Sequence, residues 1–176
     1  MSIATEPSNK NFLSPLGFKF GVKKLPNVNW FVQAVNLPGL SLPDTSVAAP
    51  FVNIPISGDR IQFEYLEVTF RVDEDMENYL ELYRWFIGTG FPNNFEQYAG
   101  IDQTSQTNRF TNMEAIRSDA SLIILNSKMK PKVEIAFRDV RPVSISELKF
   151  DTRMADVTYI DATATFRYLD YTITSL

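Results

Sequence analysis

Alternating apolar and polar side chains predict that the chain is built mainly of β-strands. Between Leu16 and Lys23 every second residue is apolar, so one face of a strand is buried and the other meets solvent. The stretch from Val157 to Ile173 alternates in the same way, with a polar face rich in threonine. Further strands are predicted over residues 28–37, 47–56, 61–72, 121–126, 133–137 and 140–150.

The strand predicted over residues 61–72 changes parity partway along. Its first apolar residues have odd numbers and its later ones have even numbers. One flat strand would expose half of these side chains, because successive residues point to opposite faces of a sheet. The sequence therefore predicts a bulge or a sharp bend near Tyr65 and Leu66.

One helix is predicted from Glu74 to Ile87, where apolar residues recur at spacings of three and four. The acidic run Asp73-Glu74-Asp75 suits the start of this helix, because carboxylates cap free backbone N–H groups and favour the positive end of the helix dipole. Two glycines followed by Pro92 predict where the helix stops.

Prolines and polar stretches predict the irregular parts of the chain. Residues 37–43 contain two prolines and are predicted to be an apolar loop. Residues 47–56 also contain two prolines, which places this strand at a sheet edge because proline cannot donate to a ladder. Residues 1–15 are predicted to form an extended arm, and residues 92–120 a long loop insertion.

These elements predict a single domain spanning residues 1–176, mainly β, with a sandwich or barrel of about eight strands and one packed α-helix. Several strands are apolar on both faces or are flanked by prolines. Exposed edges of such strands invite pairing with another chain. A closed ring of identical subunits satisfies these edges, so the pattern favours a ring-forming protein.

The composition removes several classes of function. The chain has no cysteine and no histidine, which excludes thiol nucleophiles, Ser-His-Asp triads and zinc sites with Cys or His ligands. Its net charge of −4 argues against binding DNA by neutralising phosphates. No apolar run approaches the ~20 residues of a membrane helix, and no secretory signal is recognisable. We therefore expect no catalytic, cofactor-binding or metal site and no membrane association.

Two other classes of function are the alternatives. Trp30 or Trp85 could stack on a sugar in a glycan-binding β-sandwich module, although core packing is the commoner role of tryptophan. Asp73 and Asp75 could serve a carboxylate-dependent hydrolase, although helix capping accounts for both. The stretch Gly88-Thr89-Gly90 follows a helix rather than opening one, so it is not a phosphate-binding loop.

Short motifs occur along the chain in a distinctive order. LPG at residues 37–39 is followed by GDR at 58–60, by VTFRVDED at 68–75, by the helix and by a late strand. This ordered set resembles the tail-tube proteins of contractile-tailed bacteriophages. The resemblance runs from Val28 to Leu176 and implies the phage tail-tube fold.

Within that family, residues 26–40, 85–92 and 95–98 resemble the subunit that closes the tube. The resemblance implies a structural virion protein, not an enzyme. Such a protein forms a hexameric ring that terminates the tail tube at its head-proximal end, stabilises the sheath and neck junction, and leaves a channel for DNA. A major tail tube subunit or a baseplate tube-initiator protein is the alternative.

The resemblance also implies a location and partners. The protein would be made in the host cytoplasm and would lie in the virion tail. Its partners would be further copies of itself, the tail tube protein, neck and sheath-terminator proteins and the tape measure protein. Genomic DNA would pass through without sequence-specific binding, and no cofactor is implied.

Three groups of residues are candidates for these contacts. Asp161, Thr163 and Thr165, on the polar face of the last strand, are candidates to face the channel, where acidic side chains would repel DNA. The candidate docking residues for the neck or sheath are Phe95, Tyr98, Arg109 and Phe110. The candidate subunit-interface or ring-stacking residues are Leu37, Pro38, Gly39, Leu40, Ser57, Gly58, Asp59 and Arg60.

Overall fold

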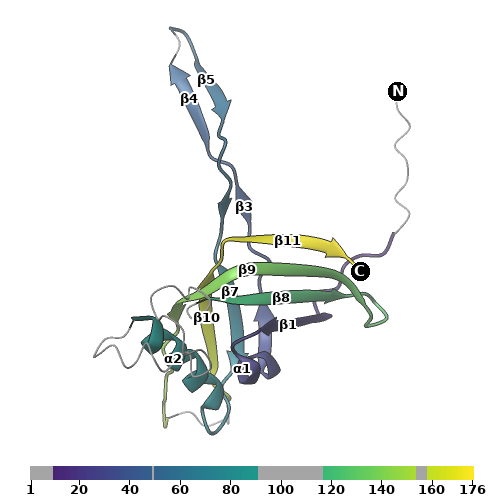
Figure 1. The fold of residues 1–176 in the computed structure, drawn as a ribbon, viewed down its shortest axis with the longest axis vertical. Coiled ribbons are helices and arrows are strands. Elements are labelled where there is room, and N and C mark those ends of the chain that lie inside the picture. The colour runs from purple at the N-terminus through teal and green to yellow at the C-terminus, as the bar shows by residue number, and fades with distance from the viewer. Residues whose placement is uncertain (1–9, 49, 91–116, 154–157) are drawn as a thin grey trace, which may run out of the picture.

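The computed structural model describes residues 10–48, 50–90, 117–153 and 158–176 (Figure 1). Within these ranges the chain is mainly β, as the sequence predicts. In chain order the elements are β1 (Phe18–Val22), α1 (Pro26–Trp30), β2 (Val32–Val35), β3 (Leu40–Ser41), β4 (Asp44–Ala48), β5 (Asn53–Ser57), β6 (Gln62–Phe63), β7 (Leu66–Arg71), α2 (Glu77–Gly90), β8 (Ser118–Leu125), β9 (Pro131–Ile145), β10 (Asp161–Arg167) and β11 (Asp170–Ser175).

The main sheet is antiparallel, with the strand order β1-β8-β9-β10-β7-β2, and β11 pairs with β9 off this path. The long strand β9 joins two layers. Its first part pairs with β8 and β11, and its last part pairs with β10. Between the two parts, Asp139 has a φ of 56°, a left-handed conformation that interrupts the regular strand. We call β1, β8, β11 and the start of β9 the first layer, and β2, β7, β10 and the end of β9 the second layer.

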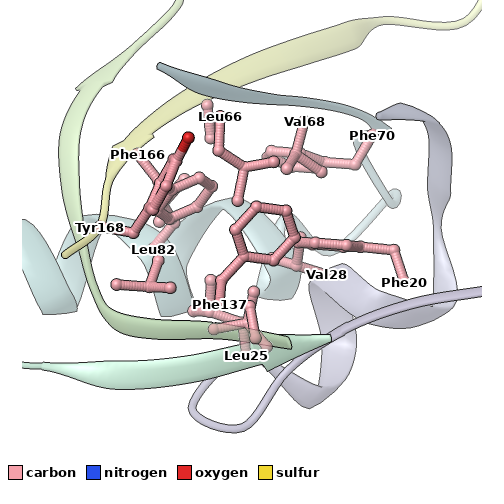
Figure 2. Packing of buried hydrophobic residues seen from close by; sticks show 14 of the residues in the cluster. Phe20, Leu25, Val28, Leu66, Val68, Phe70, Leu82, Phe137, Phe166 and Tyr168 are labelled. Carbon is pink, nitrogen blue, oxygen red and sulfur yellow. The ribbon is translucent and has the colours of Figure 1, made fainter. Parts of the chain in front are cut away.

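The hydrophobic core lies where the inner faces of the two layers meet, with both helices at its border (Figure 2). Phe137 comes from the first layer, Phe70 and Phe166 from the second, Val28 from α1 and Leu82 from α2, and all five are almost completely buried. Each such side chain contributes roughly 1.5–3 kcal/mol through its removal from water. Because both layers and both helices contribute side chains to the core, its packing fixes how the outer surfaces of the layers are positioned.

The bend predicted near Tyr65 and Leu66 is confirmed. Strand β6 ends at Phe63 and β7 begins at Leu66, so the chain changes direction between them. Leu66, Val68 and Phe70 are all completely buried, but Ile61 and Tyr65 are exposed, so the expectation that the bend brings both sets of apolar residues into one core is wrong.

The predicted helix is confirmed but is displaced along the chain. It begins at Glu77 rather than Glu74, because the side chain of Asp73 accepts hydrogen bonds from the backbone N–H groups of Glu77 and Asn78, both at 3.1 Å. At the other end it continues through both glycines to Gly90.

The strand predicted over residues 28–37 is wrong in its first half, where the chain forms α1. Pro26 occupies the first turn, which proline's fixed φ favours. The side chain of Asn29 then accepts a hydrogen bond from the N–H of Val22, at 2.7 Å, and donates one to its carbonyl, at 2.9 Å. These two bonds fix the short helix against the end of β1, and only residues 32–35 remain as a strand.

Three other strand predictions differ in how the segments are divided. The segment 47–56 is not one edge strand but belongs to a hairpin, β4 and β5. Residues 133–137 and 140–150 were predicted separately, but most of them form the continuous strand β9. The last predicted strand, 157–173, is divided at Tyr168 and Leu169 into β10 and β11, which lie in different layers.

The ends of two predicted segments also differ from expectation. Within the predicted arm, residues 10–14 are exposed and have no helix or strand, and residues 1–9 lie outside the described ranges. Strand β8 already begins at Ser118, inside the predicted loop 92–120.

Candidate assembly surfaces

The most prominent surface feature is a hairpin that projects far from the two layers (Figure 1). Its strands, β4 and β5, pair along their whole length, and every residue of both strands is exposed. A two-stranded hairpin is marginally stable by itself in water, because it buries too little apolar surface. The length of this one therefore indicates that it makes contacts outside the described chain.

The two faces of the hairpin differ in chemistry. Thr45 lies opposite Ile56, and Val47 lies opposite Ile54. These four residues form the apolar hairpin face, on which Val47, Ile54 and Ile56 are each about half exposed. The opposite face carries Asp44, Ser46, Ala48, Asn53, Pro55 and Ser57.

The tip of the hairpin extends the apolar surface. Phe51 is fully exposed, and Val52 beside it is two-thirds exposed. Exposed apolar surface on one side of a projecting element is typical of a protein–protein contact. The prolines of this segment predict an edge but not the apolar face. The signal for the face is that every second residue on each side of the tip, Thr45 and Val47 before it and Ile54 and Ile56 after it, belongs to the same face.

The predicted interface residues gather at the base of this hairpin. Residues 37–40 lead into it and residues 57–60 lead out, and Leu40 pairs with Phe63 across the small β3–β6 ladder. Gly58 approaches the other strand closely, since a Cβ atom there would lie 2.0 Å from the carbonyl oxygen of Pro43. A side chain at this position would force the two segments to move apart, which favours glycine.

Two hydrogen bonds fix the base of the hairpin to the body. The backbone N–H of Glu64 donates to the carbonyl of Gly39, at 3.1 Å. The hydroxyl of Tyr171 in β11 donates to the carbonyl of Pro38, at 3.3 Å. The leucines beside them, Leu37 and Leu40, remain about half exposed. The base is therefore held in place while its apolar side chains stay available.

The predicted channel-facing residues lie together on the outer face of the second layer. Thr163 shares a hydrogen bond with Thr69, at 3.2 Å, and Thr165 lies opposite Glu67. Asp161 accepts a hydrogen bond from Nε of Arg71, at 3.0 Å. This ion pair raises the pKa of Arg71 and compensates the carboxylate's charge.

The charge of this outer face differs from the acidic character expected for it. Where β7, β10 and β9 pair, this face carries two acidic residues, Glu67 and Asp161. It also carries three basic residues: Arg71, Arg141 and Arg167. Arg141 lies directly opposite Arg167. Alternation along the strands predicted a polar face, but only the register reveals that β9 adds an arginine to it.

The main sheet also ends in strands that carry free backbone groups. Among the described residues, β1 and β2 stand at the two ends of the strand order. Such edges can accept a strand from another chain.

The remaining candidates from the sequence lie outside the described residues or have a structural role. The candidate docking residues Phe95, Tyr98, Arg109 and Phe110 lie outside the described residues. In the described part of the chain, no group of three or more Asp and Glu residues is arranged to hold a metal, and the side chain of Asp73 is engaged in capping α2. No helix in the same part is sufficiently long and apolar to cross a bilayer.

The two tryptophans differ from each other. Trp85 is buried, as core packing predicts, and its ring lies 6.1 Å from that of Phe166. Trp30 is 85% exposed, so the expectation that it packs in the core is wrong. It lies at the end of α1, where the helix directs Val28 rather than Trp30 into the core.

Comparison with known proteins identifies the family. No protein-family model matches the sequence. The tail tube terminator protein of Enterobacteria phage T4 is 31% identical over 140 residues, which cover 77% of this chain and 72% of that protein. The chain belongs to the tail tube terminator family. This membership confirms the resemblance to contractile-tail proteins that the ordered motifs indicated.

Solved structures show the same fold as this terminator-family chain. The tube-terminating cap of the anti-feeding prophage covers 100% of both chains, with a TM-score of 0.60 and 11% identity. A sheath/tube terminator of an extracellular contractile injection system, PVC, covers 94% of this chain and 99% of its own, with a TM-score of 0.57 and 12% identity. At these identities the likeness establishes the fold alone.

Proposed function

We propose that the chain is a structural virion protein that forms a homohexameric ring, terminates the tail tube at its head-proximal end and leaves a channel for DNA. Its proposed place is the virion tail, after synthesis in the host cytoplasm. The observation that carries this proposal is the projecting hairpin, whose apolar face is uncovered within the described chain. Membership in the terminator family supports the end of the tube over its wall or the baseplate.

The hairpin supplies the cohesion of the proposed ring. Burial of the apolar hairpin face against a neighbouring copy removes Val47, Ile54 and Ile56 from water, which provides the driving force that the isolated hairpin lacks. A head-to-tail arrangement, in which each copy inserts its hairpin into the next, closes into a ring when the rotation between copies is a whole fraction of a turn. The residues at the hairpin base, 37–40 and 57–60, then become subunit-interface or stacking residues.

The outer face of the second layer is the proposed channel wall. Asp161, Thr163 and Thr165 lie on it, and hydrogen bonds to β7 engage the first two. Around Asp161 and Thr163 the hydrogen-bonded and paired groups offer DNA phosphates few strong binding groups, whereas Arg141 and Arg167 at one end of the face are not paired with a described carboxylate. This mixture of charges replaces the acidic wall expected from the sequence.

The proposed partners follow from the names of similar proteins. The T4 relative is a tail tube terminator, and one structural neighbour is described as a sheath/tube terminator. We propose that this ring contacts the last tube ring, the neck and sheath-terminator proteins, and the tape measure protein inside the tube. By these contacts it stabilises the sheath and neck junction.

The proposal is tested by placing a charge on one face of the hairpin. Ile54→Asp introduces a carboxylate on the apolar hairpin face, and a carboxylate that becomes buried at an interface costs several kcal/mol. We expect association to weaken by about 2 kcal/mol or more, roughly 30-fold, and capping of tail tubes to be lost. Sedimentation velocity and electron microscopy of tubes mixed with the protein measure the two effects.

Ser46→Asp is the matched control, because it places the same charge on the opposite face of the same hairpin. It should leave assembly and capping close to those of the unmodified protein. Assembly of both variants equal to the unmodified protein would contradict a role for the apolar hairpin face.

A further inference from the structure

A small cavity of about 120 Å³ lies where β9 bends and β10 passes into β11. It is a half-open depression that includes the left-handed residue Asp139, and three of its lining residues, Arg141, Arg167 and Leu169, are exposed. Its lining residues are Arg117, Asp139, Arg141, Arg167, Tyr168 and Leu169. Three arginines around one carboxylate make the cavity locally basic, in a chain whose net charge is −4.

Two of the three arginines have partners within the described chain. Nη1 of Arg117 donates to Oδ2 of Asp139, at 3.1 Å. The guanidinium of Arg167 lies over the ring of Tyr65, 5.1 Å from its centre. Arg141 is exposed, and among the described residues it forms no ion pair. The cavity thus holds two guanidinium groups, those of Arg141 and Arg167, whose charges no described carboxylate neutralises.

The pairing of β9 with β10 makes the placement of these arginines energetically unfavourable. Arg141 and Arg167 lie directly opposite each other in the β9–β10 ladder. Like charges at directly opposite positions destabilise a sheet. An anion bound between the two guanidinium groups would reverse the sign of this interaction, because each arginine offers a planar set of N–H donors to the same acceptor.

We propose that this cavity, which we call the arginine cavity, binds an acidic side chain from a second copy of the chain. The proposal rests on the homo-oligomer of the proposed function and adds a second contact beside the base of the hairpin, since Tyr168 of the cavity contacts Phe63, the residue that pairs with Leu40. A volume of 120 Å³ is about that of four water molecules, which suits one carboxylate group. The chain supplies such groups in excess, with 21 acidic residues against 17 basic ones.

Charge favours a carboxylate over DNA. Glu74 and Asp75 are exposed beside α2 and form no ion pair among the described residues, so a neighbouring copy can present acidic groups at its surface. Duplex DNA is the weaker occupant, because its binding needs clustered basic groups and the chain has a net charge of −4.

Arg141→Glu tests the proposal because it has opposite effects on folding and on association. Within one copy it replaces a repulsive pair by an attraction between Arg167 and the introduced carboxylate, so the subunit should not lose stability. Between copies it places a carboxylate where a carboxylate should bind, so association should weaken about tenfold or more. Arg84→Glu, on the exposed side of α2, makes the same change in net charge and should have little effect on either property.

Two measurements separate these effects. Sedimentation velocity gives the association constants of the unmodified protein, R141E and R84E. Thermal unfolding is compared between I54D and I54D/R141E, so that the hairpin substitution holds both proteins as single subunits. We expect R141E to associate more weakly than the unmodified protein. We expect I54D/R141E to unfold at a temperature equal to or above that of I54D.

Three results overturn the proposal. In the first, the unmodified protein forms rings and R141E associates as strongly as it does; this result leaves the proposed function intact. Another is a fall in subunit stability that accounts for the weaker association. The third is an R141E ring of normal stability that has lost affinity for fluorescent duplex DNA, which would assign the cavity to phosphate. Failure of the unmodified protein to form rings would instead contradict the proposed function itself.

Discussion

Tyr168 shows how a single side chain couples the two layers. It is the first residue after β10, and its ring contacts the edge of Phe63 at 5.8 Å and of Phe137 at 5.1 Å between ring centres. Its hydroxyl is buried and has no hydrogen-bond partner among the described residues. Burial raises the pKa of Tyr168 to about 12, because the phenolate would lose its hydration.

This raised pKa predicts a loss of stability in alkali. Between pH 10 and 12 the folded chain keeps the Tyr168 proton while the unfolded chain releases it. The free energy of unfolding should therefore fall as pH rises through this window, by about 2–3 kcal/mol from this residue. Tyr168→Phe should remove that component and should be neutral or stabilising at pH 7, since the buried hydroxyl is unpaired.

Denaturant unfolding of the two proteins between pH 7 and 12 measures the effect. The two stability curves should diverge above pH 10, with the phenylalanine variant the more stable. Parallel curves over the whole range would show that Tyr168 titrates like an exposed tyrosine.

At the scale of elements, the hairpin depends on one glycine at its base. A methyl group at Gly58 would lie 2.0 Å from the carbonyl oxygen of Pro43, so the two chains must separate or rotate to accept it. We expect Gly58→Ala to leave the core intact and to change the direction of the hairpin. Assembly should weaken while thermal unfolding of the subunit changes by only about 1 kcal/mol.

Gly90→Ala is the matched control, because no atom lies within 4 Å of a Cβ at Gly90. Alanine should be tolerated there and should favour the helix. Light scattering after gel filtration measures assembly for both variants. Normal assembly of Gly58→Ala would show that the hairpin base tolerates displacement.

Sequence patterns predicted those elements whose signals are local. The bend before Leu66 follows from a change of parity, and the capped start of α2 follows from Asp73, so both could be predicted from neighbouring residues. Helix α1 could not, because its five residues show no helical period and its position depends on bonds between Asn29 and Val22. The division of the last strand at Tyr168 depends likewise on pairing with two different layers.

The candidate surfaces could be predicted from the sequence less completely than the strands. The motifs at 37–40 and 57–60 were identified, but only the fold brings them together below the hairpin. The arginine cavity depends on the register of β9 with β10, since Arg141 and Arg167 are separated by a long stretch of chain. Spatial arrangement of this kind arises from tertiary packing, which periodicity along one strand cannot specify.

At the scale of the whole molecule, the chain combines a complete core with an incomplete exterior. The core draws on both layers and both helices. Outside it, several large apolar side chains of the body, among them Leu16, Trp30 and Ile173, are also exposed. The projecting hairpin, the two end strands β1 and β2, and the arginine cavity each present groups that the described chain leaves without a matching surface. Repeated copies around a ring would supply those surfaces with a single type of contact.

The molecular mass of the assembled protein tests this account most directly. Native mass spectrometry of the purified protein, alone and after addition of tail tubes, should find a particle of six chains, each of 20.1 kDa. Single chains of 20.1 kDa under both conditions, with no binding to tubes, would contradict the proposal that sister copies complete this molecule.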